Sequence, residues 1–272
     1  MSPHIRLTIA AVAPSPAMQP VMRRRNGTAV SIHTHALPLC IPRWKRLLDL
    51  VLVFLFAVVW LPLIVVISYG IKVISPGPVF FRQRRIGLGG RAFMILKFRS
   101  MRVNAETTSH ERYLQRLMES NVPMAKLDPS DRRLIPLGHL LRASGLDELP
   151  QILNVLRGEM SLVGPRPCTE VEYACYKPSQ TKRVKAPPGL TGYWQVHGKN
   201  RTTFNRMIAM DRLSAQRMSL LLDLNILART LPVLFRETFG TLIVRWRSLR
   251  LKREISIDQT TANGVTTPSS HE

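Results

Sequence analysis

An unbroken apolar stretch, LVLVFLFAVVWLPLIVVI from Leu50 to Ile67, constrains this chain more than any other feature of its sequence. The stretch carries no charged side chain and is long enough to suggest a membrane helix. Pro62 lies inside it, removes one backbone donor and clashes with the preceding turn, so we expect a kink near Val58–Leu61. A straight helix over Leu47–Ile74 would measure roughly 40 Å and could cross a membrane, whereas its first half alone, roughly 20 Å, could not.

Basic residues flank this apolar stretch on both sides. Lys45 and Arg46 precede it, and Lys72, Arg82, Arg84 and Arg85 follow it. Basic flanks mark the cytoplasmic side of a membrane helix, so a kinked helix that enters and leaves on one face satisfies both observations. The sequence therefore favours a re-entrant membrane helix within residues 42–76. An ordinary membrane pass with a tolerated proline and a buried core helix of a soluble protein are the alternatives.

The charge of the chain indicates an anionic partner. Lys and Arg number 39 against 17 Asp and Glu, a formal net charge of +22, which suits nucleic acid, a membrane surface or a phosphorylated substrate. The three cysteines form no CxxC pair, which argues against a disulfide framework and against a structural zinc site. We expect a disordered basic N-terminal tail over residues 1–41, a catalytic domain over 77–240, and a basic then polar C-terminal tail over 241–272.

The segment Ser75–Met101 predicts two short strands joined at Gly87–Gly90. Alternation along the second strand places Lys97 and Arg99 on one face, where two cations suit a phosphate or a lipid headgroup. A solvated strand edge kept soluble by these cations is an equally good interpretation.

Two adjacent acids, Asp147 and Glu148, stand just before Pro150 in the segment SGLDELPQ. Proline is best accommodated in the first turn of a helix, so we expect a helix from about Leu149 to Gly158 with the acids at its N-terminus. Neighbouring side chains point in different directions, which indicates separate tasks for the two carboxylates. One as nucleophile and one as metal ligand is a reasonable division.

Two arginines accompany the acids. Arg142 lies five residues before Asp147, and Arg166 lies in the stiff loop GPRP, Gly164–Pro167, which suits a guanidinium that must meet phosphate oxygens in one geometry. The alternative is plain: the acids are helix caps, and the two arginines are their surface salt-bridge partners.

Three ordered motifs resemble one known family. They are ILKFRSM (Ile95–Met101), LDELPQILNVLRGEMSLVGPRP (Leu146–Pro167) and PGLTGYWQVHGKN (Pro188–Asn200). Together they resemble the bacterial sugar transferases of the monotopic phosphoglycosyl transferase family, over about Pro42–Leu234. Three features depart from the family pattern. Lys199 replaces the usual arginine, DRRLI, Asp131–Ile135, lacks the usual threonine, and Ala186–Pro188 stand where a cation is usual just before PGLTG.

The resemblance implies an enzyme that transfers a sugar-1-phosphate from a UDP-sugar to polyprenyl (undecaprenyl) phosphate and releases UMP, the initiating step of exopolysaccharide, capsule or glycan synthesis. It implies Asp147 as the nucleophile of a covalent aspartyl-phosphosugar intermediate, Glu148 as the ligand of Mg²⁺, and Arg142 as a catalytic cation. The implied substrate-binding residues are Arg166, Lys97, Gln151 and Lys199. Galactose, glucose and N-acetylated sugars are all compatible with these motifs.

The expected fold is mainly α with a small β-hairpin: a re-entrant helix kinked at a proline, and interfacial amphipathic helices around a compact cytoplasmic catalytic domain. Thr202–Phe239 predicts these amphipathic helices, interrupted near Pro232, although a soluble helix pair gives the same pattern. The expected place is the cytoplasmic face of the bacterial inner membrane, with anionic lipids as partners and a homo-oligomer possible. We expect no nucleic-acid partner, because no recognised nucleic-acid module is present. A membrane-anchored scaffold without turnover is the alternative function.

Overall fold

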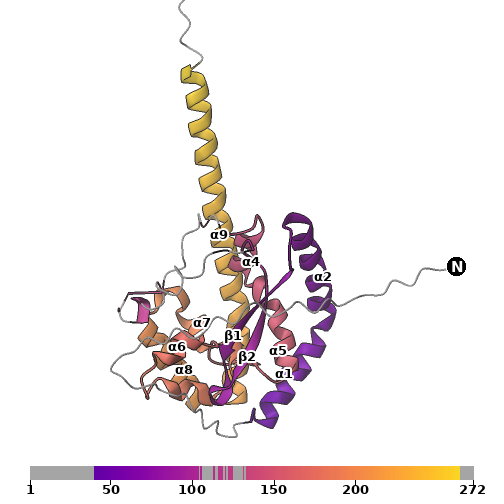
Figure 1. The fold of residues 1–272 in the computed structure, drawn as a ribbon, viewed down its shortest axis with the longest axis vertical. Coiled ribbons are helices and arrows are strands. Elements are labelled where there is room, and N and C mark those ends of the chain that lie inside the picture. The colour runs from indigo at the N-terminus through magenta and orange to yellow at the C-terminus, as the bar shows by residue number, and fades with distance from the viewer. Residues whose placement is uncertain are drawn as a thin grey trace, which may run out of the picture. The chain divides into compact units, whose positions relative to one another are not determined.

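The computed structural model describes residues 40–103 and 133–263, and between them positions 105, 113, 116–118, 120, 122–124 and 131. Most of the expected N-terminal tail, residues 1–39, and the last residues, 264–272, lie outside the described part of the chain. The described chain is mostly helical and contains two small two-stranded sheets, which confirms the expected mainly α composition with its β-hairpin (Figure 1).

The apolar stretch forms two helices, α1 (Arg43–Leu55) and α2 (Ala57–Ile74), which meet at Phe56. The predicted kink at Val58–Leu61 is therefore misplaced, because α2 continues through Pro62 and the helix breaks before it. At the break the indole Nε1 of Trp60 donates a hydrogen bond of 2.8 Å to the Val53 carbonyl, near the end of α1. The side chain thus supplies a donor at the point where the regular backbone ladder is interrupted.

Lys45 and Arg46, which precede the apolar stretch, contact other parts of the fold. Lys45 is buried and forms an ion pair with Asp223, and Arg46 donates to the carbonyls of Val155 and Leu156, the latter at 2.6 Å. These contacts attach the start of α1 to the elements of the catalytic region.

The predicted hairpin is present. Strands β1 (Phe80–Ile86) and β2 (Ala92–Phe98) pair antiparallel with Phe80 opposite Phe98, and Gly89 adopts a φ of +66° in the turn. The predicted alternation along β2 is wrong, since neighbouring Ile95 and Leu96 are both buried. Arg99 is also buried and donates to the carbonyls of Ser75 and Pro76 at 2.7 and 2.6 Å, so it is used by the fold and does not stand beside Lys97 as an open cation.

A second sheet was not predicted. Strands β3 (Ser161–Val163) and β4 (Gly189–Thr191) are parallel, and backbone hydrogen bonds continue past them, from Gly164 N to Thr191 O at 2.8 Å and from Gly189 N to Pro165 O at 2.9 Å. The two strands therefore fix the start of the GPRP loop.

The remaining elements surround the hairpin. In Figure 1, α1 and α2 lie on one side of it and α6, α7 and α8 on the other. These elements are α4 (Gly138–Ser144), η2 (Leu146–Gln151), α5 (Ile152–Leu156), α6 (Glu170–Ala174), η3 (Thr181–Lys185), α7 (Tyr193–His197), η4 (Lys199–Arg201), α8 (Phe204–Gln216) and α9 (Leu220–Asn263).

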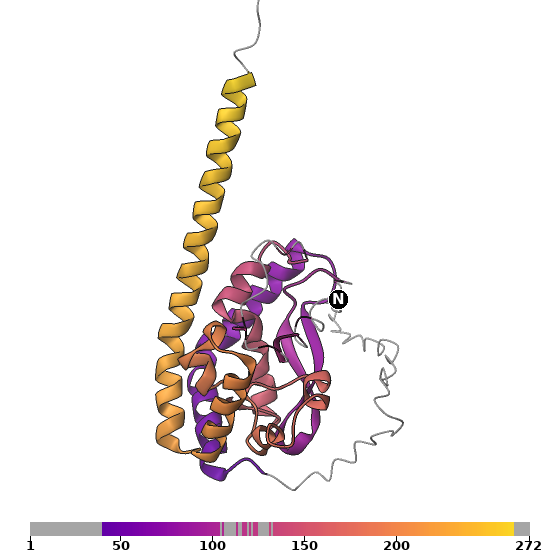
Figure 2. The same cartoon turned by 90° about the vertical axis from the view of Figure 1, so that its left-hand side faces the viewer.

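The C-terminal helices differ from the prediction in their boundaries. The interruption lies between Gln216 and Leu220, whereas Pro232 is inside α9, and α9 continues past residue 240 to Asn263, where a tail was expected. The start of α9 lies beside α1, where Asp223 meets Lys45 (Figure 2).

Apolar clusters join α1 and α2 to the rest of the fold. Val53 and Trp60 pack with buried residues of β2 and α5, and Ile71 packs with Phe98 of β2 and Leu141 of α4. The outer face remains exposed, with Val58 at 79% and Val66 at 66%. By length and composition α2 is the one helix among the described residues that could cross a membrane, with a mean hydropathy of 2.2 and 11% of it buried.

Candidate active site

The acidic pair lies in a tight 3-10 turn. Gly145 takes a left-handed φ of +73° at the end of α4, and η2 carries Asp147, Glu148 and Pro150 before α5 begins at Ile152. The predicted helix start near Leu149 is therefore wrong by about one turn. The acids do not cap a regular helix, which removes the simplest structural interpretation of this pair.

Lys97 of β2 reaches Glu148 across the packed β2 and η2 segments. Its Nζ lies 2.5 Å from Glu148 Oε1, and the two side chains are 22% and 34% exposed. This ion pair borders solvent, so its partners remain accessible to a ligand. The prediction that Lys97 belongs to the same site as the acids is compatible with this geometry.

The two adjacent carboxyl groups differ in acidity. Burial raises the pKa of Asp147 from 3.8 to about 6, and neighbouring Glu148 adds to this increase while Lys97 and Arg142 oppose it. For Glu148, burial also favours the neutral form, but Lys97, Arg166 and Lys199 outweigh it and lower the pKa. Glu148 is therefore the more acidic member of the pair, and Asp147 is the one with a pKa of about 6.

The cations predicted for the site change the pKa values of the two acids. Arg166 and Lys199 both act on the pKa of Glu148, and Arg142, exposed on α4, acts on that of Asp147. Lys199 has a positive φ of +36° and forms an ion pair with Glu237 of α9. Lys97 contacts Glu148 directly, and Arg142, Arg166 and Lys199 act on the acids through their charge.

Gln151, the remaining predicted substrate-binding residue, is buried. It is 2% exposed, and its Nε2 has no hydrogen-bond partner within the described part of the chain. Gln151 is the last residue of η2 and follows the acids in sequence. Its side chain does not reach the surface.

Arg166 is held by residues that the sequence analysis missed. Its Nη1 lies 3.1 Å from Oε1 of the buried Glu172, and its carbonyl accepts a hydrogen bond of 2.8 Å from Arg183 Nη2. Arg183 also pairs with Asp211, and this partner raises the pKa of Arg183 although burial opposes it. The spacing Thr169-x-x-Glu172 is a capping-box signature and could have identified α6 and its buried acid.

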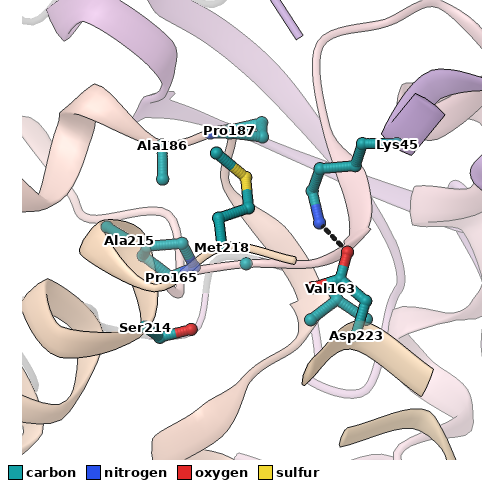
Figure 3. A pocket seen from close by; sticks show the side chains of 10 residues that line it. Lys45, Val163, Pro165, Ala186, Pro187, Ser214, Ala215, Met218 and Asp223 are labelled. Carbon is teal, nitrogen blue, oxygen red and sulfur yellow. Dashed lines mark hydrogen bonds and ion pairs between the residues drawn. The ribbon is translucent and has the colours of Figure 1, made fainter. Parts of the chain in front are cut away.

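A second buried charge cluster lies apart from the acids. Lys45 and Asp223 line a cavity of about 10 Å³ with Val163 and residues of the 186–187 and 214–218 segments (Figure 3). A space of this size is about enough for one water molecule. A cavity beside Arg166 and Arg183 is equally small. The candidate active site is the partly exposed region at Asp147 and Glu148, which line neither of these cavities.

The donor groups at this surface fit a magnesium ion only in part. No group of three His, Cys, Asp or Glu side chains that could hold a metal occurs among the described residues. Mg²⁺ usually binds one or two carboxylates and completes its octahedron with water and substrate phosphates. Glu148, one-third exposed with one oxygen on Lys97, fits that mode.

Comparison with known proteins decides the family. The family described as "Bacterial sugar transferase" matches residues 41–237 of this chain. The chain belongs to this family. The transferase is similar to the exopolysaccharide production protein ExoY of Sinorhizobium fredii, with 39% identity over 196 residues, 69% of this chain and 84% of the relative.

Other relatives carry names that state a reaction. The transferase is 40% identical over 198 residues to a UDP-glucose:undecaprenyl-phosphate glucose-1-phosphate transferase of Caulobacter vibrioides, covering 70% of this chain and 69% of the relative. It is 33% identical over 200 residues to an undecaprenyl-phosphate galactose phosphotransferase of Salmonella typhimurium, covering 71% of this chain and 40% of the relative. These findings confirm the family inferred from the three motifs.

Proposed function

We propose that this protein transfers a sugar-1-phosphate from a UDP-sugar to undecaprenyl phosphate or a similar polyprenyl phosphate, and so initiates synthesis of an exopolysaccharide or another lipid-linked glycan. The names of the relatives support the donor and acceptor classes. The observation that carries the proposal is the adjacent acid pair Asp147 and Glu148 in η2, with Lys97 in contact with the one-third exposed Glu148.

In the first step an oxygen of the Asp147 carboxylate attacks the phosphorus that carries the sugar. The bond from this phosphorus to the oxygen bridging the two phosphorus atoms breaks, and UMP leaves with the electron pair. The product on the enzyme is an aspartyl-phosphosugar. Burial raises the pKa of Asp147 and disfavours its charge, which makes the ionised carboxylate a better nucleophile than a fully hydrated one.

In the second step an oxygen of the polyprenyl phosphate attacks the same phosphorus, and the Asp147 carboxylate leaves unchanged. Both steps develop charge on phosphate oxygens, so positioning and neutralisation are the main demands on the protein. Arg142, Arg166, Lys97 and Lys199 supply fixed positive charge, whereas Gln151 is buried and is not assigned a substrate contact. Mg²⁺ bound through Glu148 would supply further neutralisation of the phosphates.

We further propose that α1 and α2 form a re-entrant element on the cytoplasmic face of the bacterial inner membrane. Both its ends contact the catalytic elements, through Lys45 at the start and Ile71 near the end, while the outward face is apolar. A helix that crossed the membrane would separate its two ends by the thickness of the bilayer. The exposed side chains of Leu231, Phe235 and Phe239 on α9 suit an interfacial position.

The test is UMP release by the purified, detergent-solubilised protein with Mg²⁺, polyprenyl phosphate and a panel of UDP-sugars. We expect release from at least one donor by the wild type and by Glu170→Gln, whose exposed pair with Arg84 lies outside the acid pair. Asp147→Asn should release none. Radiolabelled sugar phosphate retained on wild-type protein when the lipid is omitted would support the covalent step. A folded wild type that is silent across the panel would favour the scaffold alternative.

A further inference from the structure

Two arginines converge on one buried carboxylate at the edge of the candidate active site. Glu172 is 1% exposed, with Oε1 3.1 Å from Arg166 Nη1 and Oε2 3.8 Å from Arg85 Nη1. The arginines come from different parts of the chain, β1 and the GPRP loop. Glu172 is therefore the group that connects these two cations.

The carboxylate of Glu172 is fixed at the start of α6. Thr169 N donates to Glu172 Oε2 at 2.5 Å, and Glu172 N donates to Thr169 Oγ1 at 3.0 Å, a complete capping box. Burial opposes its charge, but Arg166 and Arg85 outweigh burial and lower the pKa of Glu172. Glu172 is thus an ionised group with little freedom to move.

Arg166 is held at its backbone as well as at its guanidinium. Arg183 Nη2 donates to the Arg166 carbonyl at 2.8 Å, and Arg183 in turn bonds the Tyr176 hydroxyl at 2.7 Å and pairs with Asp211. The Arg166 side chain is nevertheless 33% exposed. A guanidinium has five N–H donors, so the contact with Glu172 leaves most of them for a ligand.

The charges of this network do not cancel. Arg85, Arg166 and Arg183 face Glu172 and Asp211, which leaves one positive charge in excess. Arg85 and Arg183 are buried at 7% and 1% exposure, so the excess is accessible only at Arg166. The charge of Arg166 also lowers the pKa of Glu148. An anion bound at Arg166 would neutralise the excess charge.

We propose that Glu172 is a positioning residue that holds the Arg166 guanidinium in place for the diphosphate group of the donor, with Arg85 adding positive charge behind it. The identity of that anion rests on the proposed function. The role of Glu172 does not, because the contacts that fix Arg166 belong to the protein alone.

The test is a double-mutant cycle read by calorimetric binding of two probes, UDP and inorganic pyrophosphate, to the full-length protein in detergent. Glu172→Gln removes the charge that holds Arg166, and we expect about tenfold or greater loss of affinity for both probes. Arg166→Ala should lose at least as much. The double variant should bind no more weakly than Arg166→Ala, because the loss in Glu172→Gln comes from the displaced Arg166 guanidinium, which the double variant no longer has.

Matched variants separate positioning from folding. Glu170→Gln, two residues away on the same helix and half-exposed in its pair with Arg84, should stay within about twofold of wild type. Glu172→Asp keeps the charge but shortens the reach, so its affinity should lie between wild type and Glu172→Gln. If Glu172→Gln fails to fold, the same cycle is run with Glu172→Asp.

Three results would overturn the inference: unchanged affinity in Glu172→Gln, losses that add in the double variant, or a folded wild type that binds neither probe. Failure of the proposed function would give another result. The wild type would release no UMP from any donor, while pyrophosphate binding by the variants would still follow the expected cycle.

Discussion

At the scale of single residues, the unequal acidity of Asp147 and Glu148 determines how activity depends on pH. If Asp147 is the nucleophile, it must be ionised, so kcat/KM should rise with pH and reach its midpoint near the folded-state pKa of about 6. Lys97 lowers this pKa, so Lys97→Met should move the midpoint to higher pH. The exposed Lys182→Met should leave it in place. A profile measured from pH 5 to 9 that is flat above pH 5 would contradict this assignment.

The same pKa shift affects stability. Because the folded state raises the pKa of Asp147 above its ordinary 3.8, the fold binds this proton more tightly than the unfolded chain does. The stability that this provides is present below pH 4 and is lost as pH rises through about 6. Asp147→Asn should therefore raise the free energy of unfolding at pH 7.5, by about 1–2 kcal/mol after allowance for partial exposure, and leave it nearly unchanged at pH 4. Denaturant unfolding at both pH values measures the difference, and equal effects at both would refute it.

At the scale of elements, the break between α1 and α2 depends on Trp60. Its indole donates to the Val53 carbonyl at 2.8 Å and packs in the cluster with Ile95 and Val155. Trp60→Phe keeps most of the ring but leaves the carbonyl without this donor, which should cost about 1–3 kcal/mol. The midpoint of thermal unfolding in detergent should fall by roughly 2–4 °C for each kcal/mol. Trp44→Phe, in α1 away from the break, is the control, and an equal shift in both variants would contradict the role of Trp60.

The elements also show what the sequence could and could not predict. The hairpin was predictable because its turn glycines and strand residues are local signals, and the acids, Lys97 and Arg166 were found through motifs. The β3–β4 pair was not, because three-residue strands carry no readable alternation and depend on contacts distant in sequence. The role of Asn154 was not predictable for the same reason. Its buried amide accepts from Leu96 N and donates to the Met94 carbonyl, beside a strand that is far away in the chain.

Prolines were misleading for a related reason. Pro62 and Pro232 are strong local signals for a break, yet both lie inside helices, while the real interruptions fall at Phe56 and between Gln216 and Leu220. At Phe56 the break is accompanied by the hydrogen bond from the Trp60 indole to the Val53 carbonyl, which the proline rule does not take into account. Asp211 was missed because its partner Arg183 lies 28 residues away. Glu172 had a local signal in its capping box with Thr169, but its contact with Arg85 of β1 is distant in sequence.

At the scale of the whole molecule, membrane attachment should depend on the outward apolar face of α1 and α2 more than on net charge. Val58 and Val66 are 79% and 66% exposed, so replacing both by glutamate removes no internal packing. Each acid placed in hydrocarbon costs about 2 kcal/mol or more, so the double variant should bind vesicles at least about tenfold more weakly.

Val122→Glu, at a 58% exposed valine outside these helices, is the matched control. Flotation with phosphatidylglycerol-containing vesicles at low and high salt measures the binding. We expect the wild type to stay bound to the vesicles in high salt and the double variant to be lost from them. If attachment were electrostatic, high salt would release the wild type from the vesicles, and the double variant would behave like the wild type.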